Sequence, residues 1–328
     1  MKKILIIQTA FIGDVILATA LVEKLHAFYA DAAIDFLVRK GNESLLLNNP
    51  KLNRVVIWDK KQDKLFNLFK IIKEVRKHDY DLVINPHRFA SSGLIAACSG
   101  AKITVGFSKN PFSVFYNQKF KHEIGNGKHE TERNQLLIEA YTDSEAERPK
   151  LYPSGSDVAT TASLTNVENY ICIAPASVWF TKQLPLSKWL ALIATYHNSL
   201  IQIYLIGAPG DKSICDTLVD ESKYPLIKNL AGQLSFLQAA VVMQQAQMNY
   251  VNDSAPLHIC SAMNAKVTAV FCSTVPSFGF GPLSDDATIL ETKEKLSCRP
   301  CGLHGFKACP QGHFKCALTI SFVKSQEL

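Results

Sequence analysis

The sequence lacks several features that would assign it to a common class at once. No apolar run approaches the roughly 20 residues of a membrane-spanning helix. No G-x-G-x-x-G follows the first apolar run, which argues against a dinucleotide oxidoreductase. "GAPGDKS" (207–213) lacks the spacing of a phosphate-binding loop, and "HETER" (129–133) lacks the second histidine of an H-E-x-x-H zinc site.

Charge is also modest. The 328 residues are 20% charged with a formal net charge of +6, and the basic residues are dispersed without interleaved aromatics. This pattern argues against a dedicated nucleic-acid-binding protein. It suits an anionic substrate or a weak attraction to an anionic membrane face, and an ordinary solvated surface explains it equally well.

Cysteine usage and the first residues bear on the compartment. Nine cysteines, an odd number, predict free thiols in a reducing cytoplasm. The opening "MKKILIIQTAFIGDVILATALV" imitates a signal peptide, but Asp14 interrupts its apolar stretch. We therefore expect a cytoplasmic protein.

The remaining pattern alternates between short β-rich runs and helical segments, in two blocks. This order predicts α/β architecture, with parallel sheets covered by helices. In the first block we expect strands at 4–9, 34–38, 54–58, 81–85 and 103–107, and helices at 14–28, 42–48, 63–77, 91–98 and 131–141. In the second we expect strands at 170–177, 201–207, 226–232, 248–253 and 266–271, and helices at 186–197, 211–221, 235–246 and 255–263.

A polar segment, "TDSEAERPKLYPSGSDVATTAS", separates the blocks and is typical of a linker. The sequence therefore predicts two doubly wound, Rossmann-like domains, residues 1–155 and 156–328. Ligands of such domains bind at the carboxyl ends of the strands. We expect the two sheets to face a shared cleft with these ends.

The loop after the first strand supplies a candidate base. Asp14 follows Gly13 at the start of a helix, where aspartate is a good N-cap. A carboxylate at the carboxyl edge of the sheet could also take a proton from a substrate. Gly13 would let a ligand approach the backbone closely.

Two loops of the second block carry candidate nucleotide-binding groups. Lys182 follows a strand, where its ammonium could meet a diphosphate, and Ser177 and Thr181 could add hydrogen bonds. A solvated loop lysine is the ordinary alternative. Asp211, after a Gly-rich turn, could accept hydrogen bonds from ribose hydroxyls or cap the next helix.

"NDSAPLHICSAM" (252–263) places polar residues where a strand leads into a helix. Helix N-termini bind anions through open N–H groups, and the small Ala255 leaves room for phosphate oxygens. Asp253 would then hold sugar hydroxyls or the Lys182 ammonium. Ser254 is a candidate cap, and His258 lies one turn into the helix, where a structural role is the alternative.

The tail from 298 to 316 is rich in cysteine. Cys298, Cys301, Cys309 and Cys316 could form a four-ligand structural zinc site, although the second pair has a C-x6-C spacing that is not a standard zinc-ribbon pattern. Free thiols are the alternative, and we favour them.

Four segments in this order, "QTAFIGDVILATALVEKL", "PASVWFTKQLP", "IGAPGDK" and "VNDSAPLHICSAM", resemble the ADP-heptose:lipopolysaccharide heptosyltransferases of glycosyltransferase family 9. The tail with "CPQGHFKC" resembles members of the heptosyltransferase II type. The resemblance implies a GT-B fold whose first domain takes the acceptor and whose second takes the nucleotide sugar. It also implies a C-terminal segment that packs back onto the first domain.

The resemblance further implies an inverting glycosyltransferase that needs no metal or other cofactor. Asp14 falls on the family's catalytic base and Lys182 on its diphosphate-binding lysine. Asp211 falls on a ribose-contacting acid, often glutamate in the family. The segment Asp253, Ser254 and Ala255 falls on the donor-binding Asp-[ST]-Gly, with alanine in place of glycine, and His258 on the histidine of the same helix. The implied donor is ADP-heptose or another nucleotide sugar.

Cations of the first block are candidate acceptor-binding groups. His87 and Arg88 follow a strand, and Lys119, Lys121 and Lys128 lie in an irregular stretch. They could bind phosphates or carboxylates of a lipopolysaccharide inner core, and solvated loop charges are the alternative. A lipid-linked acceptor would bring the enzyme to the inner face of the cytoplasmic membrane. Two other functions stay open: a sugar-nucleotide epimerase of the same fold, and a non-catalytic zinc- or nucleic-acid-binding protein.

Overall fold

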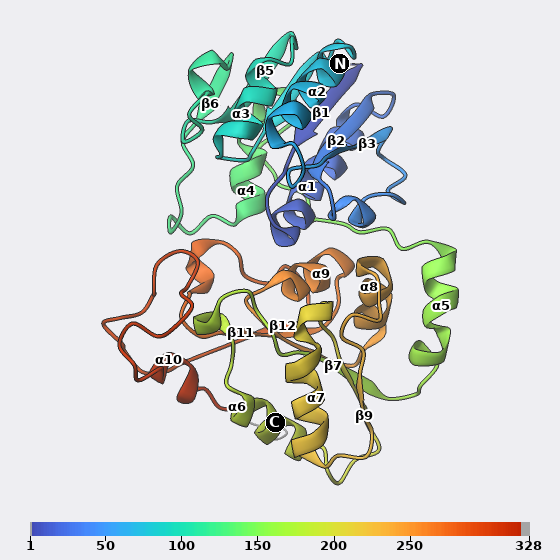
Figure 1. Cartoon of the computed structure of the whole chain (residues 1–328), viewed down its shortest axis with the longest axis vertical. Helices are drawn as coiled ribbons and strands as arrows, with labels where there is room; N and C mark the ends of the chain where they lie inside the picture. The colour runs from blue at the N-terminus through green and yellow to red at the C-terminus, as the bar shows by residue number, and fades with distance from the viewer. Residues whose placement is uncertain (1, 323–328) are drawn as a thin grey trace. The chain divides into compact units, whose positions relative to one another are not determined.

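The computed structural model describes residues 2–322 and divides the chain into two compact units, residues 1–152 and 153–328. The predicted boundary at 155/156 lies close to this division. Each unit contains one six-stranded parallel sheet with helices packed around it (Figure 1). The α/β class expected from the alternating pattern is confirmed.

The first unit has its strands in the order β3-β2-β1-β4-β5-β6. The strands are β1 (Lys3–Ile7), β2 (Ala33–Arg39), β3 (Arg54–Trp58), β4 (Leu82–Asn85), β5 (Ile103–Phe107) and β6 (Gln118–Phe120). The α-helices are α1 (Ile12–Phe28), α2 (Lys64–Arg76), α3 (Ala90–Ala97) and α4 (Glu130–Gln135). The 3-10 turns are η1 (Glu43–Leu45), η2 (Ser113–Phe115) and η3 (Glu139–Tyr141).

The second unit repeats this topology, with the order β12-β11-β10-β7-β8-β9. The strands are β7 (Tyr170–Ala174), β8 (Gln202–Leu205), β9 (Ile227–Asn229), β10 (Asn249–Asn252), β11 (Val267–Phe271) and β12 (Ala287–Glu291). The α-helices are α5 (Gly155–Thr165), α6 (Leu186–Ala194), α7 (Lys212–Ser222), α8 (Phe236–Gln245), α9 (Ala255–Met263) and α10 (Lys315–Leu318). The 3-10 turns are η4 (Phe180–Lys182), η5 (Pro209–Asp211) and η6 (Pro276–Phe278).

Both orders are those of a doubly wound sheet, in which the chain reverses its winding direction beside the first strand. The switch lies between β1 and β4 in the first unit and between β7 and β10 in the second. Loops that follow these four strands therefore emerge side by side at the carboxyl edge of each sheet. His87, Lys182 and Asp253 lie in these connections, and Asp14 lies in the first turn of the helix that follows the β1 loop.

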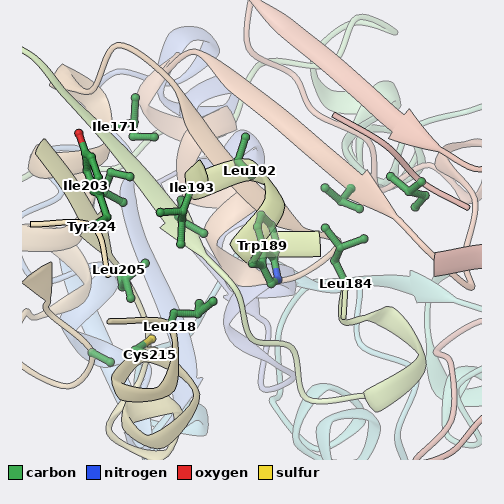
Figure 2. Close-up of a cluster of buried hydrophobic side chains, with 14 of the residues drawn as sticks. Ile171, Leu184, Trp189, Leu192, Ile193, Ile203, Leu205, Cys215, Leu218 and Tyr224 are labelled. Atoms are coloured by element: carbon green, nitrogen blue, oxygen red, sulfur yellow. The ribbon is translucent and has the colours of Figure 1, made fainter. Parts of the chain in front are cut away.

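Apolar strands and helices hold each sheet in place. Strand β1 is buried along "ILII", as expected for a parallel strand with both faces covered. Helix α1 is buried continuously from Val15 to Leu25. In the second unit, Trp189 and Ile193 of α6 pack with Ile203 and Leu205 of β8 (Figure 2). Burying each such side chain contributes about 1.5–3 kcal/mol.

Several predicted elements were wrong or incomplete. The helix expected at 42–48 is only the 3-10 turn η1, and that expected at 131–141 is divided into α4 and η3. Strands β6 and β12 and helices α5 and α10 were missed. Helix α5 begins inside the predicted linker, where Ser154 and Asp157 form a capping box. The Asp157 amide donates to Ser154 Oγ at 3.1 Å, and the Ser154 amide donates to Asp157 Oδ2 at 2.8 Å.

The end of the described chain packs within the second unit. Ala317, Ile320 and Phe322 contact its apolar core around Trp189. The C-terminal segment expected to pack back onto the first domain continues into residues 323–328, which lie outside the described residues. Among residues 2–322, no helix combines the length and apolar composition that crossing a bilayer requires.

Candidate active site

Asp14 lies in the first turn of α1, at the carboxyl edge of the first sheet. The helix begins at Ile12, two residues before its expected start, so that Asp14 is its third residue and Gly13 its second. The Phe11 amide donates to Asp14 Oδ2 at 3.1 Å. Asp14 therefore caps the helix in part, as the alternative predicted. The capping bond uses one oxygen of the half-buried carboxylate, and the other oxygen takes no part in it.

The surroundings of Asp14 make it a stronger base than an ordinary aspartate. Burial and, to a smaller extent, the negative charge of Glu130 raise the pKa of Asp14 to about 6, although the Phe11 amide and the charges of Arg88 and Arg39 act in the opposite direction. A base whose pKa lies close to neutral pH accepts a proton more readily than one near 4 while still being mostly ionised.

Glu130 belongs to a polar cluster that sequence reasoning did not identify. It is 8% exposed, binds His122 Nε2 through both oxygens at 3.1 Å and accepts from Arg133 Nε at 2.7 Å. Burial opposes ionisation of Glu130, but His122 and Arg133 outweigh it and hold the pKa of Glu130 below its usual value. The cluster thus keeps a negative charge near Asp14, on the helix α4 that packs against α1. In the sequence, Glu130 stands out only as the glutamate after His129 in the incomplete zinc motif, which does not predict a contact with Asp14.

His87 lies across the switch point from the Asp14 loop and is nearly buried. Its Nδ1 lies 3.0 Å from Thr9 Oγ1. Burial, together with the charges of Lys60, Arg88 and Arg39, lowers the pKa of His87 to about 3. His87 is therefore neutral at pH 7, and the expectation that it acts as a cation is not supported.

Lys60, which the sequence did not single out, is a cation at this edge. Its Nζ donates to the carbonyl and hydroxyl oxygens of Thr9, both at 2.9 Å, and lies over the Trp58 ring. Burial and the charges of Arg39 and Lys64 lower the pKa of Lys60 to about 8. Within residues 2–322, neither Lys60 nor Arg39 makes an ion pair with a carboxylate.

The three lysines that were predicted to bind the acceptor lie in β6 or in the connection between β6 and α4. Lys121 follows the edge strand β6, is exposed and forms an ion pair with Glu123. Lys119 lies within β6 and Lys128 in the loop before α4, and both are exposed. Arg88 follows His87 directly, with its guanidinium over the Phe89 ring.

In the second unit, the switch point brings Lys182 and Asp253 into contact. Lys182 Nζ lies 2.6 Å from Asp253 Oδ2, and Thr274 Oγ1 donates to the same oxygen at 2.6 Å. This is one of the two roles expected for Asp253. Because Asp253 is buried and bound on two sides, it fixes the position of the ammonium at the end of the sheet.

Asn252 and Arg299 hold the loops around this pair, and neither was predicted. The Leu184 amide donates to Asn252 Oδ1 at 3.0 Å, and Asn252 Nδ2 donates to the Pro175 carbonyl at 2.8 Å, which ties both ends of the Lys182 loop to β10. Arg299 donates to the carbonyls of Phe271, Cys272 and Thr274 at 2.8–3.1 Å. Buried side chains with several such bonds make a loop rigid.

Helix α9 begins beside the pair. Ser254 is its N-cap but makes no side-chain capping bond, and its hydroxyl donates to the Asn252 carbonyl at 3.3 Å. Ser254 and Ala255, at the start of the helix, are partly exposed, as an anion site at a helix N-terminus requires. His258 is 6% exposed and lies edge-on to Phe280.

Hydrogen bonds within the second unit engage the three other residues that were predicted to bind the donor. Thr181 is 1% exposed, and its hydroxyl oxygen is bonded to Ser273 Oγ at 3.0 Å and to the Phe306 amide at 2.8 Å. It therefore holds the loop and the tail together, and its role at the donor site stays a prediction. The carboxylate of Asp211, the N-cap residue of α7, accepts from the Ala208 amide at 2.8 Å. Ser177 is partly exposed, and its carbonyl accepts from Gln183.

The cysteine-rich tail does not form the four-ligand site considered above. Cys298 Sγ lies 3.8 Å from His313 Nε2, and Cys301 Sγ donates to the Cys298 carbonyl. Within residues 2–322, no three or more His, Cys, Asp or Glu side chains are arranged to hold a metal ion. The tail instead packs closely on the Lys182 loop. At Gly305 the approach is so close that a side chain would meet Thr181 Oγ1 at 2.8 Å.

Comparison with known proteins identifies the family. The family model described as glycosyltransferase family 9 (heptosyltransferase) matches residues 68–304. Lipopolysaccharide heptosyltransferase 3 of Escherichia coli is 26% identical over 80% of this chain and 82% of its own length.

Two solved structures share the fold. The glycosyl transferase family 9 structure from Veillonella parvula DSM 2008 matches with a TM-score of 0.81 and 20% identity, over 89% of this chain and 86% of that one. E. coli ADP-heptose lps heptosyltransferase II matches with a TM-score of 0.78 and 20% identity, over 96% and 97%. These matches favour a glycosyltransferase over the epimerase and over the non-catalytic zinc- or nucleic-acid-binding protein. The chain therefore belongs to glycosyltransferase family 9 (heptosyltransferase) and is a glycosyltransferase with the GT-B fold.

Proposed function

We propose that this protein transfers heptose from ADP-heptose to the core of a lipopolysaccharide, with inversion at the anomeric carbon. The heptosyl donor and the lipopolysaccharide acceptor are suggested by the names of the relatives. The observation that carries the proposal is the pairing of chemistry at the two switch points. One has a carboxylate tuned toward neutral pH, and the other has an ammonium fixed beside an accessible helix N-terminus.

Asp14 is the proposed general base. An acceptor hydroxyl beside Asp14 attacks the anomeric carbon of the donor, a C–O bond forms, and the hydroxyl proton passes to the carboxylate. Positioned proton transfer of this kind contributes roughly 10²–10⁴-fold to the rate. The bond between the anomeric carbon and the diphosphate oxygen breaks, and ADP leaves. The reaction requires the two units to bring acceptor and donor together in the bound complex.

Lys182 and the start of α9 are the proposed diphosphate site. Negative charge grows on the leaving phosphate oxygen as its bond to the sugar breaks. A positioned ammonium and an accessible N–H stabilise such charge because they are already oriented before the reaction. The partner Asp253 holds the ammonium in place, while Ser177, Asp211 and His258 stay candidates for contacts with sugar or nucleotide. The chemistry needs no metal.

Arg39, Lys60 and Arg88 are the proposed acceptor cations, with Gly13 and the neutral His87 as further contacts. Arg39 and Lys60 lie at the same edge of the sheet as Asp14, and within the described residues neither has a carboxylate partner. Such cations suit phosphate or carboxylate groups of a saccharide core. An acceptor attached to a lipid would place the enzyme in the cytoplasm, at the inner face of the cytoplasmic membrane. Nucleic acid is not a proposed partner.

The test is a transfer assay with purified protein, ADP-heptose and lipopolysaccharide from a strain whose core lacks heptose. We expect acceptor-dependent release of ADP and a product heavier by one heptose in mass spectrometry. Product from other nucleotide sugars but not from ADP-heptose would refute the assigned donor. Conversion of the donor without any acceptor would instead restore the epimerase.

A further inference from the structure

The outward face of α2 carries large apolar side chains in open solvent. The inward face places Leu68, Ile71 and Val75 in the core of the first unit. The opposite face presents Leu65, Phe66 and Phe69, which are 70%, 70% and 65% exposed. Because residues four apart are neighbours on a helix, Leu65 and Phe69 lie together. These three side chains form an exposed apolar patch that is not part of the core of this unit.

Basic residues surround this patch. Residues 60–77 contain seven lysines and arginines but only two acids, Asp63 and Glu74. Glu74 is already bound to Arg54 at 3.0 Å. Helical spacing places Lys70 and Lys73 one turn beyond Phe66 and Phe69, on the same face. Within the described part of the chain, Lys64, Lys70, Lys73 and Lys77 make no ion pair.

A second exposed apolar pair lies nearby. Helix α3 contacts both α2 and the turn η2, and Figure 1 shows α2 and α3 on the same side of the unit. In η2, Val114 and Phe115 are 69% and 68% exposed. Lys109 and Lys119, on either side of this turn, are also exposed. This part of the first unit therefore repeats the combination of protruding apolar side chains and positive charge.

An anionic membrane surface fits this combination better than a second copy of the chain. Amphipathic helices at a bilayer insert apolar residues below the headgroups while lysines contact anionic lipid phosphates. A two-fold contact between two copies would instead set the same basic face against itself. An unpartnered excess of positive charge needs a negative partner, and the protruding side chains need an apolar one. A bilayer containing anionic phospholipid supplies both.

We propose that the outward face of α2, formed by Leu65, Phe66, Phe69, Lys70 and Lys73, docks the protein on anionic phospholipid membranes. The face is joined directly to the proposed acceptor site, because the loop that precedes α2 contains Lys60, which binds Thr9 beside Asp14. The biological purpose rests on the proposed function, since a lipid-linked acceptor would lie in the same membrane. The lipid contact itself requires neither donor nor acceptor.

The test is cosedimentation of the full chain with vesicles that contain no saccharide. We expect binding to vesicles of phosphatidylcholine and phosphatidylglycerol, and little binding to phosphatidylcholine alone. The variant L65S/F66S/F69S should bind the anionic vesicles at least about tenfold more weakly. Replacing two lysines in K70E/K73E should weaken binding by well over tenfold, since each lysine near an anionic surface contributes about fivefold.

Matched controls separate this face from general stickiness and charge. L47S removes a leucine that is 63% exposed elsewhere in the first unit. K223E/K228E reverses two exposed lysines of the second unit. Both should bind like the unaltered chain, and thermal melting should show that all variants are folded. Equal binding by the α2 variants and the controls would overturn the proposal, as would no binding by the unaltered chain.

Two further measurements keep this proposal distinct from the transferase proposal. Light scattering without lipid would detect self-association. A dimer that L65S/F66S/F69S abolishes, without vesicle binding by the unaltered chain, would assign the face to a second copy and overturn the membrane assignment. Transfer to a deacylated, water-soluble acceptor should be unchanged in L65S/F66S/F69S, so failure to bind vesicles with normal transfer would refute docking alone.

Discussion

Lys182 Nζ and Asp253 Oδ2 lie 2.6 Å apart, although 71 positions separate the two residues in the chain. The contact joins the loop after β7 to the loop after β10, the two strands that flank the switch point of the second sheet. Only 15% of the lysine side chain and 7% of the aspartate side chain are exposed. A pair this enclosed depends on both members, since removing one leaves a charge with little access to water.

Asp253→Ala should lower both stability and ADP affinity. Breaking an enclosed pair by removing one partner costs about 3–5 kcal/mol, and slightly less here because Lys182 is partly exposed. Lys182→Ala should weaken ADP binding and should also lower stability, because it leaves the enclosed Asp253 carboxylate with Thr274 as its remaining side-chain partner at that oxygen. Melting curves and calorimetric titration with ADP measure both quantities. Asp216→Ala is the control, because its ion pair with Lys212 is exposed and contributes under about 1 kcal/mol. Unchanged ADP affinity in Lys182→Ala would contradict the diphosphate assignment.

Asp14→Asn should abolish most turnover while leaving ADP affinity intact, because only the proton acceptor is lost.

The same change, Asp14→Asn, should stabilise the protein at pH 7. Folding raises the pKa of Asp14 to about 6, so the folded state disfavours the charge at every pH above the unfolded value near 4. The gain of about 1–2 kcal/mol should therefore grow between pH 4 and pH 6, stay constant above that range and vanish below it. Denaturant unfolding at pH 3.5 and pH 7 checks the sign; full activity would discard the base.

Glu130→Gln should shift the pH dependence of turnover. Activity should rise with pH as Asp14 ionises near pH 6, and removing the charge of Glu130 should lower the pKa of Asp14 and move this limb to lower pH. Arg88→Gln should move it to higher pH, because Arg88 favours the charged form. The two opposite shifts distinguish electrostatic tuning from loss of structure, which would lower turnover without moving the limb. Melting is the control for Glu130→Gln, since the change removes one carboxylate partner of the buried Arg133.

Arg39→Ala/Lys60→Ala should raise the KM for the acceptor at least about tenfold, since a hydrogen bond to a charged group contributes about 1.5–3 kcal/mol. The KM for the donor should not change. Steady-state kinetics with each substrate varied in turn provides the measurement. Lys40→Ala removes a neighbouring exposed lysine that is paired with Asp59 and serves as the control. An equal rise in both KM values would argue against a specific acceptor site.

Thr181→Val should destabilise the second unit by about 1–3 kcal/mol, because the Phe306 amide and Ser273 lose a buried partner. Because Thr181 is buried against the tail, the ADP affinity of the folded protein should stay within about twofold of the unaltered value. Thr195→Val, at an exposed position, should change stability by no more than about 0.5 kcal/mol. A large loss of ADP affinity with normal stability would restore the original prediction.

Particular elements show where sequence reasoning succeeded. The β-rich runs "ILII" and "VTAVF" became buried parallel strands, and helix α9 occupies 255–263 as predicted. Apolar periodicity and the strand-to-helix order depend on short-range patterns, which a single sequence displays. The helix expected at 131–141 was wrong: after Gln135 the Leu137 and Ile138 amides bond to carbonyls three residues back, and Gln135 Nε2 donates to the Asp143 carbonyl at 2.6 Å, a contact that no local propensity encodes.

The sequence by itself determined the α/β alternation, the family and the positions of Asp14, Lys182 and Asp253 at strand ends, because each follows from neighbouring residues along the chain. Only the tertiary structure decided what surrounds those groups. It placed Glu130 and Lys60 near the first sheet edge, enclosed Thr181 beneath the tail and left the apolar face of α2 in solvent. Burial and charge proximity arise between segments distant in sequence, so the pKa of Asp14 and the neutrality of His87 could not be obtained from spacing.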